Sequence, residues 1–211
     1  MPGGHVSIKE VQNTAVDLKR REFLLRLASI LGVVSVAGLL WPFIRALFPS
    51  AVTRAAGRPI ELDVSTLTVG EQRTVMWRGK PIWVIRRSDS AIAKLLEPNQ
   101  QLEDPESKLP QQPPYAQNAT RSLRPDILVL VAACTHLGCV PTYRPDPHTL
   151  DQYWPGGFFC SCHGSKFDLA GRVYQGMPAP TNLEVPPYYF KDLNTLVIGV
   201  HASSRVSEVN G

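Results

Sequence analysis

Hydrophobic residues follow two different patterns along the chain. Residues 27–44 form an unbroken apolar stretch without a charged side chain, and Arg26 and Arg45 bracket it. At about 1.5 Å of rise per residue, a helix of this length spans about 27 Å, close to the bilayer hydrocarbon core of about 30 Å. The two arginines can extend their charged ends to the interfaces. The pattern predicts a membrane-spanning helix within residues 23–48.

A buried core helix and a cleaved signal peptide fit this stretch less well. A core helix that is apolar on every side is rare next to the N-terminus of a small soluble domain. A cleaved signal peptide has a hydrophobic region of about 7–15 residues followed by a small-x-small cleavage site. No clean site of that kind follows residue 44. A retained anchor therefore accounts best for this part of the chain.

The polar residues 1–22 end in a pair of arginines. The sequence Arg20-Arg21-Glu22-Phe23-Leu24 resembles the twin-arginine export signal, whose route carries proteins that have already folded. A basic flank that simply keeps the N-terminus on the cytoplasmic side is the alternative. The export interpretation predicts a cytoplasmic N-terminus and a translocated remainder.

From residue 60 onward the pattern changes to short hydrophobic runs separated by turn residues. Strands are expected at 60–64, 74–77, 82–86, 127–131, 158–160, 172–174, 188–190 and 196–200. One short helix is expected at 89–96 with Ser88 as its N-cap, and residues 97–125, rich in Pro, Gln and Asn, indicate an irregular loop. The prediction is a mainly β fold: a transmembrane helix followed by a small domain of two or three antiparallel sheets.

Composition agrees with one domain plus an anchor. The chain has 211 residues, of which 44% are hydrophobic and 19% charged, so a packed core is possible. The small and polar residues 49–59 indicate a flexible tether, and residues 60–211 form the domain. The net charge of +4 is mild and the basic residues are scattered. No nucleic-acid partner is therefore expected.

Cysteine and histidine residues gather in two short boxes. All four cysteines lie between Cys134 and Cys162. Box one is Cys134-Thr135-His136-Leu137-Gly138-Cys139, and box two is Cys160-Ser161-Cys162-His163-Gly164-Ser165. Their six sulfur and nitrogen donors exceed the four ligands of a tetrahedral zinc ion, which favours a two-iron centre with two cysteines left over. A zinc site chosen from the six, or two plain disulfides with uninvolved histidines, are the alternatives.

The two boxes resemble those of the Rieske iron–sulfur family, whose [2Fe–2S] cluster has two histidine ligands. Gly176-Met177-Pro178-Ala179-Pro180 resembles the proline loop that covers the cluster in that family. The anchor and the Ala-rich tether resemble the quinol-oxidising members found in cytochrome bc complexes. The resemblance spans nearly the whole chain, with the cluster-binding part at about residues 126–185.

The resemblance also implies roles for individual residues. Cys134 and Cys160 would ligate one iron, and His136 and His163 the other. Cys139 would form a disulfide with Cys162, which requires an oxidising compartment and agrees with export. The apolar rim that docks over a quinone pocket would comprise Leu137, Gly138, Gly176, Pro178 and Pro180.

Two further residues are expected to tune the cluster through hydrogen bonds. Ser165 matches a serine that donates to a bridging sulfide in the family. Phe167 stands where many quinol-oxidising members have a tyrosine that donates to a ligand cysteine. Because phenylalanine has no hydroxyl, we expect a lower reduction potential here than in relatives with the tyrosine.

The expected function is electron transfer in a quinol–cytochrome c oxidoreductase of the bacterial inner membrane. The domain would lie in the periplasm, take one electron from ubiquinol and pass it to a c-type cytochrome, with cytochrome b as a second partner in a dimeric complex. The alternative is the Rieske subunit of another periplasmic oxidase, such as arsenite oxidase. The loop at 97–125 and the tether argue against it, and soluble Rieske ferredoxins typically lack the extra cysteine pair and the anchor.

The ligand types explain why this chemistry needs these residues. Replacing two thiolates by neutral imidazoles removes two negative charges, which raises the reduction potential by hundreds of millivolts relative to plant-type all-cysteine clusters. The ring nitrogen that does not bind iron can exchange a proton as the electron arrives. His136 and His163 are therefore the expected catalytic residues, and they must be exposed.

Overall fold

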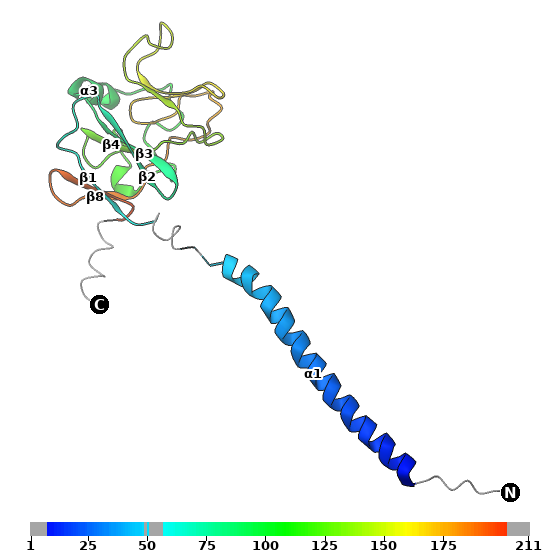
Figure 1. Cartoon of the computed structure of the whole chain (residues 1–211). Coiled ribbons are helices and arrows are strands. Elements are labelled where there is room, and N and C mark those ends of the chain that lie inside the picture. Colours follow the sequence, from blue (N-terminus) through cyan, green and yellow to red (C-terminus); the bar gives the residue numbers. More distant parts are fainter. Residues whose placement is uncertain (1–7, 49, 51–56, 202–211) are drawn as a thin grey trace. The chain divides into compact units, whose positions relative to one another are not determined.

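The chain forms two compact units, Met1–Ala51 and Val52–Gly211. The structure is a computed structural model, and it describes residues 8–48, 50 and 57–201 (Figure 1). The expectations for residues 1–7, for most of the tether at 49–59 and for residues 202–211 lie outside the described residues.

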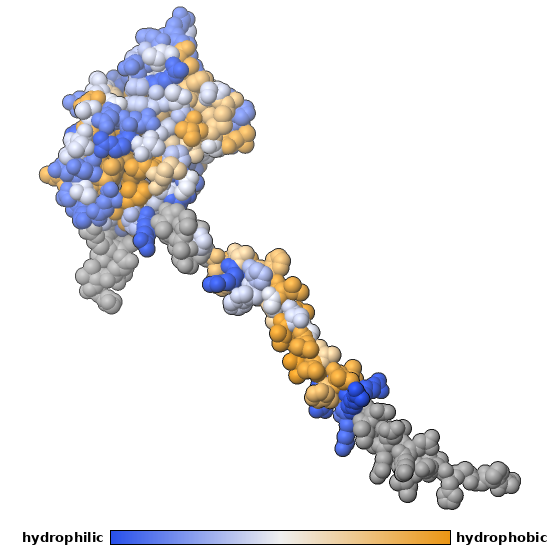
Figure 2. Space-filling model, viewed as in Figure 1, coloured by the Kyte–Doolittle hydropathy of each residue, from blue (hydrophilic) through white to orange (hydrophobic). Residues whose placement is uncertain are grey.

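The described part of the N-terminal unit contains one long helix, α1 (Ile8–Ala46). Its segment Leu18–Ala46 is long and apolar enough to cross a membrane, with a mean hydropathy of 2.2 and no buried residues. Figure 2 shows the hydrophobic surface that runs along it. The hydroxyl groups of Ser29 and Ser35 each donate to a backbone carbonyl one turn earlier, at 2.8 Å, so no side-chain donor of these two serines faces lipid unpaired.

The helix is longer than the apolar stretch that predicted it. It continues through Pro42 to Ala46 instead of breaking at the proline. A proline removes one backbone hydrogen bond, and near the end of a helix few following turns depend on that bond. The polar residues before the apolar stretch extend the same helix back to Ile8.

Within residues 57–201, the second unit contains three small antiparallel sheets, which confirms the predicted fold class. The first sheet has the order β1 (Ile60–Asp63), β9 (Thr195–Ile198), β8 (Tyr188–Phe190). The second has the order β2 (Gln72–Trp77), β3 (Lys80–Arg86), β4 (Ile127–Val131). The third has the order β5 (Thr142–Arg144), β6 (Gly157–Cys160), β7 (Ser165–Phe167).

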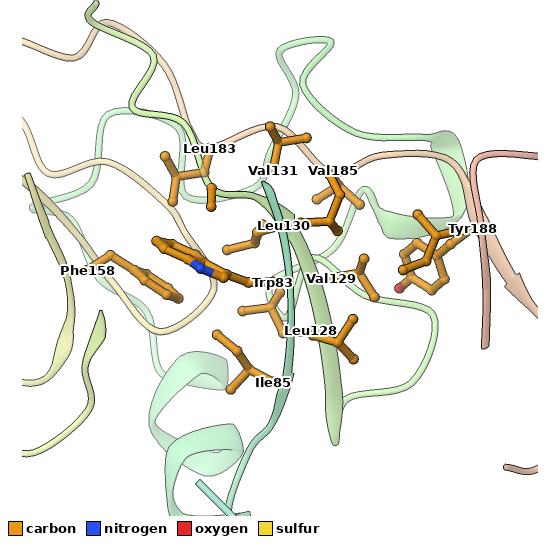
Figure 3. Packing of buried hydrophobic residues seen from close by; sticks show 14 of the residues in the cluster. Trp83, Ile85, Leu128, Val129, Leu130, Val131, Phe158, Leu183, Val185 and Tyr188 are labelled. Carbon is orange, nitrogen blue, oxygen red and sulfur yellow. The ribbon is translucent and has the colours of Figure 1, made fainter. Parts of the chain in front are cut away.

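The core includes residues of all three sheets, and one part of it lies where the second and third sheets meet. Every residue of β4 is buried, because this strand is covered on both faces. The rings of Trp83 on β3 and Phe158 on β6 stack with centroids 5.2 Å apart and an interplanar angle of 10° (Figure 3). This contact joins the sheet that carries the core to the sheet that carries box two.

The predicted helix and loop are confirmed. Helix α3 (Asp89–Leu96) begins after Ser88, whose hydroxyl accepts from the backbone N–H of Ala91 at 3.2 Å. Residues 97–125 are irregular apart from the 3-10 turn η1 (Pro114–Ala116) and isolated bridges at Leu102 and Arg124. Tyr115 at the centre of this turn donates its hydroxyl to the carbonyl of Tyr188 on β8 at 2.7 Å, which fastens the loop to the first sheet.

The strand predicted at 172–174 is wrong, and β5 and β7 were missed. Val173 pairs with Phe167 only as an isolated bridge, and its N–H donates instead to the side chain of Asn182 at 2.9 Å. The ladder therefore ends where a side chain takes the backbone donor. The strands β5 and β7 have three residues each, and their sequences, Thr142-Tyr143-Arg144 and Ser165-Lys166-Phe167, are not hydrophobic runs.

Replacing Phe158 by alanine tests the contact between the sheets. Phe158 is 0% exposed, so Phe158→Ala should lower the free energy of unfolding by about 3–5 kcal/mol through lost burial and a cavity. The neighbour Phe159 is only half-buried on the other face of β6, and Phe159→Ala should cost clearly less. Urea denaturation of both variants measures the difference, and equal losses would contradict the proposed role of the stacked ring.

Candidate metal centre

The two boxes form similar tight turns. Box one follows β4, and the N–H of Gly138 donates to the carbonyl of Cys134 at 2.9 Å. Box two joins β6 to β7, and the N–H of Gly164 donates to the carbonyl of Cys160 at 2.9 Å. Both glycines have φ near +80°, a conformation that L side chains rarely adopt. Each box therefore needs a glycine four residues after its first cysteine.

A disulfide between Cys139 and Cys162 joins the two boxes, with 6.7 Å between the Cα atoms. It is the pair that the family resemblance implies. The sulfur atoms of Cys139, Cys160 and Cys162 all lie within 4.8 Å of one another. Since two of these sulfurs are bonded together, Cys160 contributes the free thiol of this group.

Cys134 and Cys160 are the two free thiols, and they are 3% and 2% exposed. Burial raises the pKa of the Cys134 thiol; the backbone N–H of His136 opposes this rise, and the neighbouring Cys160 thiol adds to it. Two buried thiols that interact in this way become stable thiolates only when a cation compensates their charge. The pair is therefore suited to holding metal.

The two box histidines face each other across the loops. Their ring centroids are 4.7 Å apart and the planes are nearly perpendicular, at 88°. Nδ1 of His136 is buried and has no hydrogen-bond partner among the described residues, although a buried ring nitrogen normally has one. A metal ion would satisfy this atom. Two thiols and two imidazoles, one of each from either box, fit the donor set of a Rieske-type [2Fe–2S] cluster.

The proline loop is fastened to both boxes. The backbone N–H of Ala179 donates to Ser165 Oγ of box two at 3.0 Å. Thr135 Oγ1 of box one donates to the carbonyl of Thr181 at 2.7 Å. Ala179 is buried and Met177 is half-buried, whereas Gly176, Pro178 and Pro180 are exposed at the surface.

Exposed apolar side chains lie beside the boxes. Leu137 is 70% exposed and Gly138 is exposed next to it, as the prediction of a docking rim requires. The structure adds Val140, 58% exposed, directly after box one. Neither Val140 nor the link made by Thr135 was predicted. Val140 could have been found from the sequence, because it is an apolar residue directly after a cysteine box. No sequence signal indicated the hydrogen bond of Thr135.

Strand β7 places the two predicted tuning residues on one side. Ser165 and Phe167 alternate with Lys166, so their side chains point to the same, buried face of the strand. The Ser165 hydroxyl lowers the pKa of the Cys134 thiol, against the larger effect of burial, which raises it. Phe167 is 0% exposed. A hydroxyl on the Phe167 ring would therefore lie on the same side as the cysteine ligands.

Comparison with known proteins identifies the class of protein. Residues 59–188 match the Rieske [2Fe-2S] domain family, and residues 11–50 match the family described as the TAT signal of the ubiquinol–cytochrome c reductase Fe-S subunit. The chain belongs to the Rieske [2Fe-2S] family.

Three relatives have the same description, "Ubiquinol-cytochrome c reductase iron-sulfur subunit". The protein of Allochromatium vinosum is 48% identical over 87% of this chain and 90% of its own length. The protein of Blastochloris viridis is 42% identical over 87% of this chain and 94% of its own length. The protein of Rhodospirillum rubrum is 40% identical over 87% of this chain and 93% of its own length. The similarity thus includes the helical unit as well as the Rieske domain, and it agrees with membrane anchoring.

Removing the disulfide should loosen the boxes. The bond joins residues 23 positions apart, and opening such a loop in the unfolded state should cost about 3 kcal/mol of stability in the double variant Cys139→Ser with Cys162→Ser. Urea denaturation, followed by the visible absorption of the cluster, measures this loss. Wild-type protein in a strong thiol reductant is the matched control and should unfold like the variant. Equal midpoints of wild type with and without reductant would contradict the expectation.

Proposed function

We propose that this chain is the electron-transfer subunit of a quinol–cytochrome c oxidoreductase. It takes one electron at a time from ubiquinol and passes it to a c-type cytochrome, and cytochrome b receives the second electron. The observation that carries the proposal is the meeting of two buried thiols and two imidazoles beside an exposed apolar rim, on a chain with a membrane-spanning helix. The relatives support this function, and nothing favours the alternative of an arsenite oxidase subunit.

We assign the cluster ligands as follows: Cys134 and Cys160 on one iron, His136 and His163 on the other. The support is the burial of both thiols and the facing pair of imidazole rings. The unpartnered Nδ1 of His136 is the nitrogen we assign to iron, which leaves Nε2 to exchange a proton. The cluster supplies one-electron redox chemistry at a raised potential when it is bound.

The remaining residues of the site dock the quinol and orient the histidines. The exposed Leu137 presents apolar surface for docking over a quinol, and it excludes water from the contact. The exposed His163 brings its imidazole to the same surface, where it can accept a proton from a quinol hydroxyl. Thr135 and Ser165 hold the proline loop against the boxes, which keeps both histidines in position.

The membrane arrangement is part of the proposal. Residues 1–22 lie in the cytoplasm, residues 23–48 span the bacterial inner membrane, residues 49–59 are a tether, and residues 60–211 lie in the periplasm. The support is the twin-arginine pair at the start of the apolar span, the matching signal family, and a disulfide that needs an oxidising compartment. The functional complex is a dimer that contains cytochrome b and a c-type cytochrome.

Quinol-dependent cytochrome c reduction tests the function directly. In membranes that carry His163→Gln the rate should fall by a factor of about 100 or more, because a ligand and a proton acceptor are both lost. His148→Gln is the matched control: His148 is exposed, and its ring contacts the carbonyl of Gln152 outside the boxes. The chain should also co-purify with b-type and c-type haems. Normal turnover in His163→Gln membranes would contradict the proposal.

The missing tyrosine gives a second prediction. Phe167→Tyr should add a hydrogen bond towards a ligand cysteine and raise the midpoint potential. A bond that favours the reduced form by about 1–1.5 kcal/mol corresponds to about 40–60 mV for one electron. Redox titration of wild type and variant measures the shift. An unchanged midpoint with intact cluster content would show that Phe167 does not occupy the tuning position.

A further inference from the structure

Among the described residues of the domain, three arginines are buried, and the side chains of all three hydrogen-bond to one turn. Arg87, Arg121 and Arg172 are 3%, 0% and 4% exposed. The turn, residues 168–172, starts directly after β7 and leads towards the proline loop. Arg87 donates to the carbonyl of Leu169 at 3.5 Å. Arg121 donates to the carbonyls of Ala170 and Gly171 at 3.2 and 3.3 Å. Arg172 donates to the carboxylate of Asp168 at 2.7 Å.

Only one of the three has a carboxylate partner among the described residues, because Arg172 forms an ion pair with Asp168. Arg121 donates to the carbonyl of Leu183 at 2.6 Å and to Gln112 Oε1 at 3.0 Å, and its Nε has no partner in the described chain. Arg87 donates to two further carbonyls and one hydroxyl, those of Pro125, Thr120 and Ser122, each at 2.8 Å. All the acceptors of Arg87 and Arg121 are neutral.

Both unpaired guanidinium groups remain charged at neutral pH. Burial lowers the pKa of Arg87 to about 10 and that of Arg121 to about 10, still well above 7. Asp104 and Asp168 are the buried carboxylates of the described chain. Asp104 accepts from the backbone N–H groups of Lys108 and Leu109. Within residues 57–201, three buried arginines against two buried aspartates leave one net positive charge in the interior.

This charge lies in the same core as the metal ligands. A Cβ atom placed on Gly171 would lie 3.3 Å from Nη1 of Arg121 and 3.0 Å from the side chain of Leu130 on β4. Leu130 belongs to the buried cluster that also contains Cys134 and Cys160. The two guanidinium groups therefore lie in the interior among neutral hydrogen-bond acceptors and apolar side chains, where water screens their charge only weakly.

The unpaired arginines are unfavourable for folding. Burial removes the hydration of both guanidinium groups, and no carboxylate among the described residues hydrogen-bonds to either of them, although Asp168 raises the pKa of both and Asp104 raises that of Arg121. Arg121 also has φ +50°, a strained backbone conformation for a residue other than glycine. A centre that gains a negative charge on reduction is stabilised by such a cation. We propose that Arg87 and Arg121 are potential-setting residues: the buried positive charge that they leave in excess raises the reduction potential of the centre held by the two boxes. This inference rests on the proposed function.

The test is redox titration of the full-length protein in membranes, followed by electron paramagnetic resonance of the reduced cluster. Arg121→Gln keeps a hydrogen-bonding side chain but removes the charge, so the equilibrium constant for reduction should fall about two- to tenfold, a shift of about 20–60 mV downwards. Arg121→Lys keeps the charge and should stay near wild type. Asp104→Asn removes a buried negative charge and should shift the midpoint upwards. The exposed Lys108→Gln is the control and should cause no shift.

Salt separates buried from surface charges. The shifts in Arg121→Gln and Asp104→Asn should persist at high ionic strength, because mobile ions do not reach the interior. Equal shifts in Arg121→Lys and Arg121→Gln would overturn the inference, since hydrogen bonding and not charge would then set the potential. Should Arg121→Gln fail to fold, Asp104→Asn decides: an unchanged midpoint overturns the inference. If quinol reduces the wild-type cluster but the variants have unchanged midpoint potentials, the inference fails and the proposed function remains. If quinol produces no reduced-cluster resonance in the wild-type protein, the proposed function itself is rejected.

Discussion

Two thiols are packed into the interior close enough to interact, and this constraint shapes the site. Cys134 and Cys160 come from different loops, and neither is stable as a buried thiolate without a cation. The disulfide between Cys139 and Cys162 and the glycine turns of both boxes hold the loops together. The protein thus preorganises a site in which a cation must compensate the charge of the thiolates, and iron is that cation.

The same constraint extends through the domain. The stacked rings of Trp83 and Phe158 join the sheet that supplies box one to the sheet that supplies box two. Ser165 and Thr135 connect the proline loop to one box each. Buried arginines place positive charge in the core, while His163 remains at the surface. On the proposed assignment, the interior sets the electron affinity and the surface histidine exchanges the proton.

The sequence alone predicted much of the site because its residues are chemically distinctive and close together in the chain. The boxes, the proline loop, the anchor and the capped helix α3 all have local signals. The missed parts depend on tertiary structure. Strand β7 exists because box two returns alongside β6, and Val173 leaves the ladder because Asn182 takes its backbone donor. The burial of Arg121 also gave no signal, since an arginine in a polar loop is normally exposed.

Both the proposed function and the role of the buried arginines depend on the ligand set. Pulsed electron paramagnetic resonance on reduced membranes detects these ligands directly. Two imidazole ligands predict strong couplings of the unpaired electron to two nitrogen nuclei, one from His136 and one from His163. Each coupling should change when the corresponding ring is isotopically labelled. A reduced cluster without coordinated nitrogen would contradict the ligand assignment, because an all-sulfur centre would lack both the raised potential and the proton exchange that the proposed function requires.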